Sequence, residues 1–409
     1  MRTIILWTVG LTFGSGLLFS QARQKRTVSD EEVRKVHASA IVFDTHNDYP
    51  MRTIDGAKFA ERTTEGHTDL VRMKEGGMTA QFFAAYVAPN YAPQKQSAHR
   101  ALEGIDSIKR DIVGTTPADT VFATTADEIV RAKKAGKIAI LVGIEGGHAI
   151  EDSLRLLRAF YDQGVRYMTL THTNTNGWAD SEGDINNPQV KHHNGLTDFG
   201  KQVIREMNRL GMMVDVAHVA DKTFWDVLET SSAPIFSSHS SCRALSKVGR
   251  NMTDEMIQAL AKKGGQININ FSCDFLSQAA ADASPMRNPE TRARLMAILG
   301  EVKDPQERRA KMKQLMAEMN VKQVRAKLSD VVAHINHVVK LVGVDHVGIG
   351  SDFDGIGCTP EGLDDTSKWR NLTRALLEEG YTADEVRKIL GGNMLRFMKS
   401  VEAAAAKRS

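Results

Sequence analysis

The sequence predicts an α/β fold, a (β/α)8 barrel of the TIM type that carries a helical insertion. Eight apolar, β-branched runs recur along the chain, and stretches with apolar residues at three- and four-residue spacing lie between them. Polar residues follow nearly every run. Strands buried on both faces that alternate with helices indicate a parallel sheet, and eight of them indicate a closed barrel. A doubly wound open sheet is the alternative fold, but it would place its ligand at a single switch point.

The predicted strands and helices alternate along the chain. The first strand ends at His46, and the others span residues 79–86, 138–144, 167–170, 212–216, 234–237, 266–271 and 346–349. Helices are predicted at residues 29–40, 153–162, 196–210, 221–228, 253–263 and 324–342, with closing helices at 366–379 and 382–399. Ser29 with Glu32, and Thr382 with Glu385, have the spacing of a capping box at a helix start.

Two stretches are longer than the connections between strands and helices that a (β/α)8 barrel requires. Residues 176–194 are polar and rich in Gly and Asn, which predicts a long loop near the strand that precedes His172. Residues 275–320 are rich in Ala, Met, Arg, Lys and Glu and predict inserted helices. This insertion could serve as a lid, form a dimer contact, or decorate the barrel by packing on its surface. Gly391 and Gly392 interrupt the final helix, where they predict a break or a close packing contact.

The first 22 residues differ from the rest of the chain. Met1 and Arg2 precede a mostly apolar run over residues 4–19, and Ser20-Gln21-Ala22 fits a small-x-small cleavage site. This outline predicts a secretory signal peptide at residues 1–22, followed by a single barrel domain over residues 23–409. An uncleaved anchor is the alternative, although the run is short for a spanning helix. We expect an exported protein, periplasmic or extracellular, with no stable membrane anchor after cleavage.

Charge and cysteine content exclude several classes of protein. Lys and Arg total 53 against 50 Asp and Glu, which gives a formal net charge of +3. So small an excess predicts neither a nucleic-acid surface nor a polybasic membrane patch. Cys242, Cys273 and Cys358 are widely spaced, so at most one internal disulfide is expected, and disulfides are not expected to hold the fold.

Metal-binding side chains recur where the predicted strands end. His46 and Asp48 lie two residues apart on the first strand and therefore project to the same side. The polar residues at the later strand ends are Glu145, His172, His218, His239, Asn270, Asp352 and Asp354. Barrel enzymes carry their chemistry on this rim. Three His, one Glu and one Asp suffice for two cations that share a carboxylate, and they are donors that zinc takes without a thiolate.

This hypothesis depends on convergence of the strand ends. Taken alone, Glu145 fits a turn carboxylate and His218 fits a hydrogen-bonded core histidine. Ligands from separate strand ends meet only if the barrel closes. The remaining histidines lie on helices, loops or strand starts, and most are expected at the surface or in structural roles: His37, His67, His99, His148, His192, His193, His334, His337 and His346.

Blocks of residues enclose the candidate positions. They are Asp44-Thr45-His46-Asn47-Asp48, Gly143-Ile144-Glu145-Gly146-Gly147-His148, Leu170-Thr171-His172 with Trp178-Ala179-Asp180-Ser181, Asp215-Val216-Ala217-His218, Ser238-His239-Ser240-Ser241, Arg250-Asn251, Gly350-Ser351-Asp352-Phe353-Asp354-Gly355 and Asn393-Met394-Leu395-Arg396. In this order they resemble the membrane dipeptidase family, also called renal dipeptidase, and its bacterial members. The resemblance covers the chain from Asp44 to about Phe397.

The resemblance implies a zinc-dependent dipeptidase on a barrel of the metallo-dependent hydrolase type. It implies two Zn2+ per chain, bridged by Glu145. At the matching positions, His46 and Asp48 would hold one zinc ion. His218 and His239 would hold the other.

The resemblance also implies roles around the metals. His172 would contact the substrate or its tetrahedral intermediate, and Asp352 would be the acid/base residue. Arg250 would bind the C-terminal carboxylate of a dipeptide, with Arg243 in the same segment as the alternative. A hydroxide bridging the two cations would attack the peptide carbonyl, and Asp352 would pass its proton to the leaving amine.

Some family properties do not carry over. The animal members are lipid-anchored and disulfide-linked, and this chain has neither an anchor signal nor cysteines in matching places. The family accepts many dipeptides, some with C-terminal D-residues, and certain members open β-lactam rings. The sequence does not indicate which of these substrates the protein takes. A homodimer is also compatible with the sequence. The alternative function is a binuclear metal amidohydrolase that acts on N-acyl amino acids or lactams.

Overall fold

The computed structural model describes residues 23–285, 288–302, 304–318 and 324–406, and the predicted signal peptide lies outside them. Within these ranges nine strands form one parallel sheet: β1 (Phe43–Asp44), β2 (Ala80–Tyr86), β3 (Thr120–Phe122), β4 (Ile138–Glu145), β5 (Val165–Thr169), β6 (Met213–Asp215), β7 (Phe236–Ser240), β8 (Gln266–Ile269) and β9 (Val347–Ile349). β1 pairs with β2 and β9, and β2 pairs with β4, which closes eight strands into a barrel. The predicted (β/α)8 fold is confirmed.

The ninth strand, β3, lies outside the closed ring. It pairs with the first half of β4, where Thr120 faces Ile138, whereas β5 pairs with the second half of the same strand, where Thr169 faces Glu145. β3 therefore extends the wall at the amino end of the barrel. The sequence interpretation missed it, because three residues are too short to show a period.

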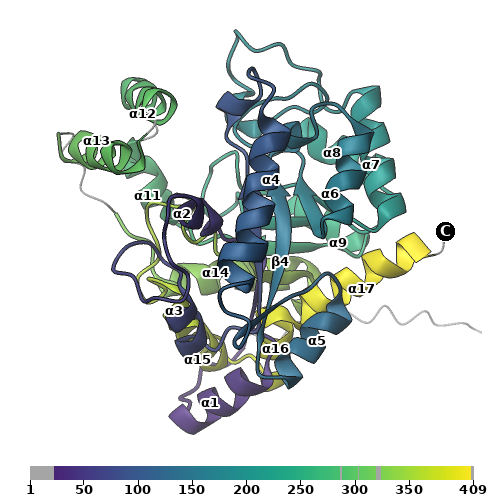
Figure 1. Ribbon diagram of the computed structural model, residues 1–409. Coiled ribbons are helices and arrows are strands. Elements are labelled where there is room, and N and C mark those ends of the chain that lie inside the picture. Colours follow the sequence, from purple (N-terminus) through teal and green to yellow (C-terminus); the bar gives the residue numbers. More distant parts are fainter. Residues whose placement is uncertain (1–22, 286–287, 303, 319–323, 407–409) are drawn as a thin grey trace, which may run out of the picture.

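Helices cover the outside of the barrel (Figure 1). They are α1 (Asp30–Ser39), α2 (Pro50–Ile54), α3 (Leu70–Glu75), α4 (Ser97–Ser107), α5 (Ala126–Lys134), α6 (Leu154–Asp162), α7 (Asp198–Leu210), α8 (Asp221–Thr230), α9 (Asp254–Lys262), α14 (Leu328–Val342), α15 (Trp369–Glu378), α16 (Ala383–Arg387) and α17 (Asn393–Ala406). The expected insertion contains α10 (Cys273–Leu276), α11 (Gln278–Ala283), α12 (Pro289–Glu301) and α13 (Pro305–Glu318). Figure 1 shows α12 and α13 standing out from the side of the barrel.

Short 3-10 and π-helical turns join these elements. They are η1 (Pro89–Tyr91), η2 (Ile108–Val113), η3 (Gly147–Ile150), η4 (Glu182–Asp184), η6 (Val344–His346), η7 (Thr366–Lys368) and η8 (Lys388–Gly392). The predicted capping box of Thr382 and Glu385 is present. At Ser29 only half of the predicted box forms: its hydroxyl accepts a hydrogen bond from the Glu32 amide, but the Glu32 carboxylate is bound by Arg26. No helix of the described residues is long and apolar enough to cross a membrane.

Aromatic rings fill the barrel. The ring centroids of Phe43 and Phe82 lie 5.6 Å apart, those of Phe82 and Tyr167 4.9 Å, and those of Tyr167 and Phe236 5.6 Å. Phe397 of α17 closes the stack, with its ring 5.1 Å from that of Phe236. Each fully buried side chain of this kind stabilises the fold by about 2 kcal/mol. Because the interior is packed, the chemistry is confined to the rim.

Some predicted boundaries are wrong. β7 begins at Phe236 and includes His239, so this histidine lies within its strand; Pro234, which has no N–H to donate, and the polar Ser–Ser–His run disguised the true limits. The helix predicted at 324–342 begins at Leu328. The expected close packing at Gly391 is confirmed, because a Cβ there would lie 2.5 Å from the carbonyl oxygen of Ile41.

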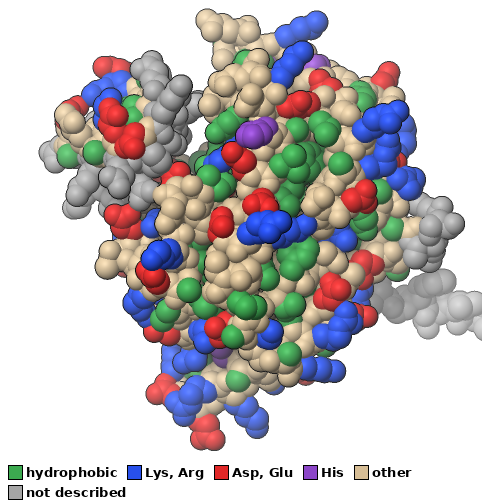
Figure 2. Space-filling model, viewed as in Figure 1, with side chains coloured by type: hydrophobic (Ala, Val, Ile, Leu, Met, Phe, Trp, Pro, Cys, Tyr) green, Lys and Arg blue, Asp and Glu red, His purple; other side chains and the backbone are tan. Residues whose placement is uncertain are grey.

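Cysteine pairing and surface charge agree with the sequence interpretation. Cys273 and Cys358 form a disulfide, and Cys242 is a buried free thiol. On the face shown in Figure 2, Lys and Arg side chains are interspersed with Asp and Glu side chains, as the small net charge predicts.

Candidate metal centre

Three strands, β1, β6 and β7, bring histidines to the carboxylate of Glu145, the last residue of β4. Its Oε1 lies 3.6 Å from Nε2 of His46, 3.0 Å from Nε2 of His218 and 3.4 Å from Nε2 of His239. The side chains of His46 and His239 are 0% exposed, and that of His218 is 11% exposed. Barrel closure therefore brings together side chains that are far apart in the sequence.

The predicted ligands also form two close pairs near Glu145. Nε2 of His46 lies 3.4 Å from Oδ2 of Asp48, and Nε2 of His218 lies 3.0 Å from Nε2 of His239. The two pairs adjoin each other: the ring centroids of His46 and His239 lie 3.8 Å apart, and the ligand atoms of His46, Glu145 and His239 lie within 4.8 Å of one another. These are the pairs that the family resemblance implies for two cations.

Two buried carboxylates hold the ligand-bearing segments from below. Asp44 accepts hydrogen bonds from the amide and hydroxyl of Ser351 and from the amide of His46. Asp215 accepts hydrogen bonds from the amide and hydroxyl of Ser238. Each carboxylate ties two strand ends together, so ligands from different strands keep a fixed spacing. Burial raises the pKa of Asp44 to about 6, although the Ser351 donors oppose this shift.

Hydroxyl groups orient two of the imidazoles. The Tyr167 hydroxyl lies 2.9 Å from Nδ1 of His46, and the Ser238 hydroxyl lies 2.7 Å from Nδ1 of His239. Both contacts leave Nε2 directed at Glu145. Partners of this kind fix the ring orientation of metal-binding histidines. The Tyr167 ring fits because a Cβ at position 143, which is glycine, would lie 2.0 Å from it.

The electrostatics of the site favour a carboxylate among neutral imidazoles. Burial alone would raise the pKa of Glu145, but the neighbouring imidazoles, including hydrogen bonds from His218 and His239, hold it well below its usual value. Burial lowers the pKa values of His218 and His239 well below normal, so both rings are neutral at pH 7. A neutral imidazole and an ionised carboxylate are the forms that bind metal.

The surroundings of His46 favour a positive charge. Burial would lower the pKa of His46, yet Tyr167, Glu145 and Asp48 raise it well above normal. Nε2 of His46 and Oδ1 of Asp48 are buried and have no hydrogen-bond partner among the described residues. Unpaired buried donors and acceptors are costly, and a cation between these atoms would satisfy them. The residues present therefore fit a metal cation.

Asp352 follows β9 and faces the first ligand pair. Its ligand atom lies within 4.8 Å of those of His46 and Asp48, and its backbone has a φ of 62°. Burial raises the pKa of Asp352 to about 8; His46 opposes this shift, and the neighbouring carboxylate of Asp48 adds to it. Asn270 donates a hydrogen bond of 2.9 Å from Nδ2 to Oδ2 of Asp352. Asp352 also shares a side-chain hydrogen bond with Asp48.

His172 lies beside the second ligand pair. Its ring centroid lies 4.5 Å from that of His218, and its Nδ1 lies 3.2 Å from the Thr173 hydroxyl and 3.5 Å from the Tyr86 hydroxyl. Burial lowers the pKa of His172 to about 4, with Arg250 adding to the shift and Glu145 opposing it. A neutral imidazole carries one N–H: with the proton on Nε2, Nδ1 would accept from these hydroxyls and Nε2 could donate to a substrate.

The geometry separates the two arginine candidates. Arg250 reaches the metal centre, because its guanidinium donates to the carbonyl oxygen of His239 at 3.1 Å and to the Ser240 hydroxyl at 3.3 Å. Arg243 makes two hydrogen bonds of 2.7 Å to the Asp221 carboxylate. Arg243 is therefore already neutralised, and Arg250 is the better candidate for a substrate carboxylate.

Comparison with known proteins identifies the family. A family model described as membrane dipeptidase, peptidase family M19, matches residues 30–409. The chain belongs to this family. It is 33% identical over 405 residues to an uncharacterized dipeptidase of Schizosaccharomyces pombe, a match that covers 95% of this chain and 86% of the relative. Family and relatives make the protein a metallo-dipeptidase, a hydrolase of peptide bonds.

Solved structures of similar proteins have the same fold. The probable dipeptidase PvdM from Pseudomonas aeruginosa has a TM-score of 0.77 and 25% identity, with 92% of this chain and 98% of that chain covered. A metallo peptidase from Rhodobacter sphaeroides, liganded with a phosphinate mimic of L-Ala-D-Ala, has a TM-score of 0.71 and 24% identity, with 89% and 100% covered.

Several residues of the M19 site went unassigned from the sequence. Tyr167 and Tyr86 lie in strands of the barrel wall, and Ser238 precedes a predicted ligand; these look like ordinary strand residues. Asn270 was placed at a strand end but given no role. Alternation along β5 puts Tyr167 inside the barrel, but its contact with His46 depends on the fold.

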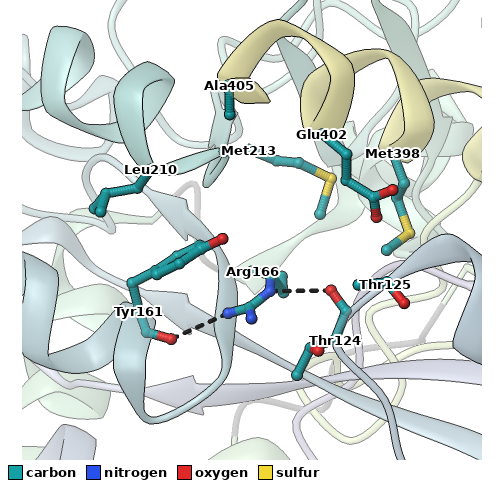
Figure 3. A pocket seen from close by; sticks show the side chains of 10 residues that line it. Thr124, Thr125, Tyr161, Arg166, Leu210, Met213, Met398, Glu402 and Ala405 are labelled. Carbon is teal, nitrogen blue, oxygen red and sulfur yellow. Dashed lines mark hydrogen bonds between the residues drawn. The ribbon is translucent and has the colours of Figure 1, made fainter. Parts of the chain in front are cut away.

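A cavity of about 140 Å³ lies away from these residues, at the amino ends of β5 and β6 (Figure 3). The Arg166 guanidinium donates to the carbonyl oxygens of Thr124 and Tyr161 there, and Glu402 lies on the far side. None of the predicted site residues lines this cavity. In a barrel the amino end contributes to stability, so the chemistry belongs at the opposite rim.

Proposed function

We propose that this metallo-dipeptidase binds two Zn2+ per chain, bridged by Glu145, and hydrolyses dipeptides, including those with a C-terminal D-residue. One observation carries the proposal: nitrogens of three histidines lie within 3.6 Å of the same carboxylate oxygen of Glu145, and Asp48 lies 3.4 Å from one of these nitrogens. When bound, the two ions would lower the pKa of a shared water, so that hydroxide attacks near neutral pH, and would polarise the peptide carbonyl.

Arg250 and His172 would hold the dipeptide. Arg250 would pair with the C-terminal carboxylate, because a guanidinium matches the two oxygens of that group. His172, kept neutral by burial, would donate from Nε2 to the oxyanion that develops on the carbonyl. A dipeptide held at both points would place its peptide bond beside Glu145.

Asp352 would move the proton. Burial and the Asp48 carboxylate raise its pKa, which strengthens the affinity of the carboxylate for a proton from the attacking water. Asn270 occupies Oδ2, so the proton would travel on Oδ1. Asp352 would then pass it to the leaving amine.

The deciding experiment couples metal analysis to a substrate panel. Purified protein should contain about two zinc ions per chain, as two sites require, and should cleave L,L and L,D dipeptides faster than N-acyl amino acids or lactams. One metal or none would refute the binuclear centre. Preference for N-acyl amino acids or lactams would favour the amidohydrolase alternative, and failure on L,D pairs would restrict the substrate to L,L.

We propose further that the protein is exported and has no stable membrane anchor. The N-terminal segment with its cleavage site supports this, and so does the Cys273–Cys358 disulfide, since disulfides persist in oxidising compartments. N-terminal sequencing of the fractionated protein tests cleavage after Ala22. A homodimer stays a prediction, which light scattering on the purified protein would measure.

A further inference from the structure

The loops that follow β8 and β9 meet at the metal centre. The β8 loop carries Asn270, and the β9 loop carries Asp352. Nδ2 of Asn270 donates to Oδ2 of Asp352 at 2.9 Å, while Oδ1 of Asn270 accepts a hydrogen bond from the amide of Ser272. The second bond fixes which way the amide points. Asn270 therefore turns its donor toward the carboxylate.

The same two loops run side by side beyond this contact. The amide of Phe271 donates to the carbonyl oxygen of Ser351 at 3.2 Å, and the amide of Cys273 donates to that of Cys358 at 3.3 Å. The disulfide between Cys273 and Cys358 then joins them covalently. Asn270 lies three residues before one cysteine, and Asp352 lies six residues before the other. The disulfide thus lies just behind the Asn270–Asp352 contact.

The β9 loop has little regular structure of its own, although the amide of Asp352 donates to the carbonyl oxygen of His46 at 3.1 Å. Between the end of β9 and η7, residues 350–365 contain no helix or longer strand. Within this loop Asp352 and Asp354 have φ values of 62° and 66°, a left-handed conformation that L-residues other than glycine adopt at a cost. Such a conformation persists only where the surroundings impose it. A covalent link reduces the number of alternative loop conformations that compete with this left-handed conformation.

We propose that Asn270 is a positioning residue for Asp352, and that the Cys273–Cys358 disulfide keeps the two residues in register. Turnover would then depend on the oxidation state of this disulfide. The inference rests on the proposed function of Asp352 as the acid/base residue. An external dithiol would supply two electrons and two protons, so that its own S–S bond forms as the Cys273–Cys358 bond breaks and two thiols result.

Reduction should lower kcat, because Asp352 would sample orientations that do not reach the leaving amine. Small misplacements of a catalytic group cost about 10- to 100-fold in rate, and we expect a fall in this range. The metal ligands come from β1, β4, β6 and β7, which the disulfide does not join, so metal content and KM should change little. If reduction unfolded the protein instead, its metal content would fall and no KM could be measured.

The first experiment measures kcat, KM and zinc content of the zinc-loaded enzyme before and after reduction, with the reductant removed by desalting before the assay. The substrate is whichever member of the panel the oxidised enzyme cleaves best. Reoxidation should restore kcat. Cys242→Ala keeps the disulfide and should respond to reduction like the wild type, whereas Cys273→Ser/Cys358→Ser should have a low kcat that reductant does not change.

The second experiment tests whether the disulfide acts through Asn270. Asn270→Ala should lower the kcat of the oxidised enzyme by about tenfold or more with KM nearly unchanged, since it removes a hydrogen bond to a charged group. Its effect should shrink in the reduced enzyme, because groups that act as a unit are not additive. Additive effects of reduction and Asn270→Ala would overturn the link between them.

The outcomes separate this inference from the proposed function. If oxidised wild type is active, Asp352→Asn is inactive and reduction leaves kcat unchanged, the positioning role of the disulfide is wrong while the acid/base role stands. If Asp352→Asn keeps full activity, both are wrong. A low kcat in the double serine variant with normal zinc content and an unchanged circular dichroism spectrum supports the inference.

Discussion

The hydroxyl of Tyr167 lies 2.9 Å from Nδ1 of His46, across the barrel from β5 to the end of β1. This contact leaves Nε2 of His46 facing Asp48 at 3.4 Å and Glu145 at 3.6 Å. The tyrosine ring is 0% exposed and stacks among the core aromatics. The packed interior of the barrel is therefore coupled directly to the orientation of a predicted metal ligand.

Tyr167→Phe should weaken zinc binding without unfolding the barrel. The ring still fills its place, but His46 loses the partner that fixes its tautomer and direction. Loss of the hydrogen-bond partner of a metal-binding histidine lowers the metal affinity by about 10- to 100-fold. Competition with a zinc chelator would measure this loss. Tyr161→Phe, at the distant cavity, is the matched control. Equal affinities for wild type and Tyr167→Phe would contradict this role.

Asp352→Asn should abolish turnover while zinc stays bound. The amide keeps the shape of the side chain and its contact with Asn270 but cannot move a proton. General acid–base catalysis is worth about 10²- to 10⁴-fold, so we expect kcat to fall by this factor. Asp345→Asn, which breaks only an exposed ion pair with Lys388, is the control. Unchanged dipeptide hydrolysis by Asp352→Asn would rule out the acid/base assignment.

Arg250→Lys and Arg243→Lys form a matched pair. Arg250 lies against the His239 backbone, so the lysine variant should lose the two-pronged contact with a dipeptide carboxylate and kcat/KM should fall about 10- to 100-fold, the value of a charged hydrogen bond. Arg243 is held by Asp221, so its lysine variant should change kcat/KM little. The reverse order of effects would assign the carboxylate to Arg243.

Much of the fold was predictable because the evidence for it is periodic. Buried β-branched runs and amphipathic helices alternate over most of the chain, and closure follows from their number. The metal ligands were predictable for a related reason: His46, Glu145 and His218 stand at or beyond strand ends, where polar residues interrupt apolar runs. Barrel closure then places all such positions on one rim.

The remainder depends on contacts between distant segments. Tyr167 touches His46 only because Gly143 leaves space for its ring. β3 is too short for a pattern, and the limits of β7 were hidden by serines that face the core. Pairing of Cys273 with Cys358 needed the course of two loops, which spacing alone does not give. These features arise from tertiary geometry, not from local preference.

His334 should make the stability of the protein depend on pH below neutrality. Its Nδ1 accepts a hydrogen bond from the Cys242 amide at 3.0 Å, and its Nε2 lies 3.1 Å from the carbonyl oxygen of Leu276. Both contacts are made by the neutral ring, which thereby joins α14 to the β7 loop and α10. Burial lowers the pKa of His334 from 6.5 to about 4, while the Leu276 carbonyl opposes the shift.

The folded protein therefore binds fewer protons at His334 than the unfolded chain does between pH 6.5 and about 4. The contribution of the neutral ring is fully present above pH 6.5 and is lost as the pH falls through this window. From about pH 7 to about pH 5 the loss is about 2 kcal/mol.

His334→Asn keeps an acceptor for the Cys242 amide but does not titrate, so the free energy of unfolding of this variant in urea should fall less over this pH range. Metal release at low pH affects both proteins and cancels in the difference. A gap between wild type and His334→Asn that is the same at both pH values would show that His334 is not the group responsible.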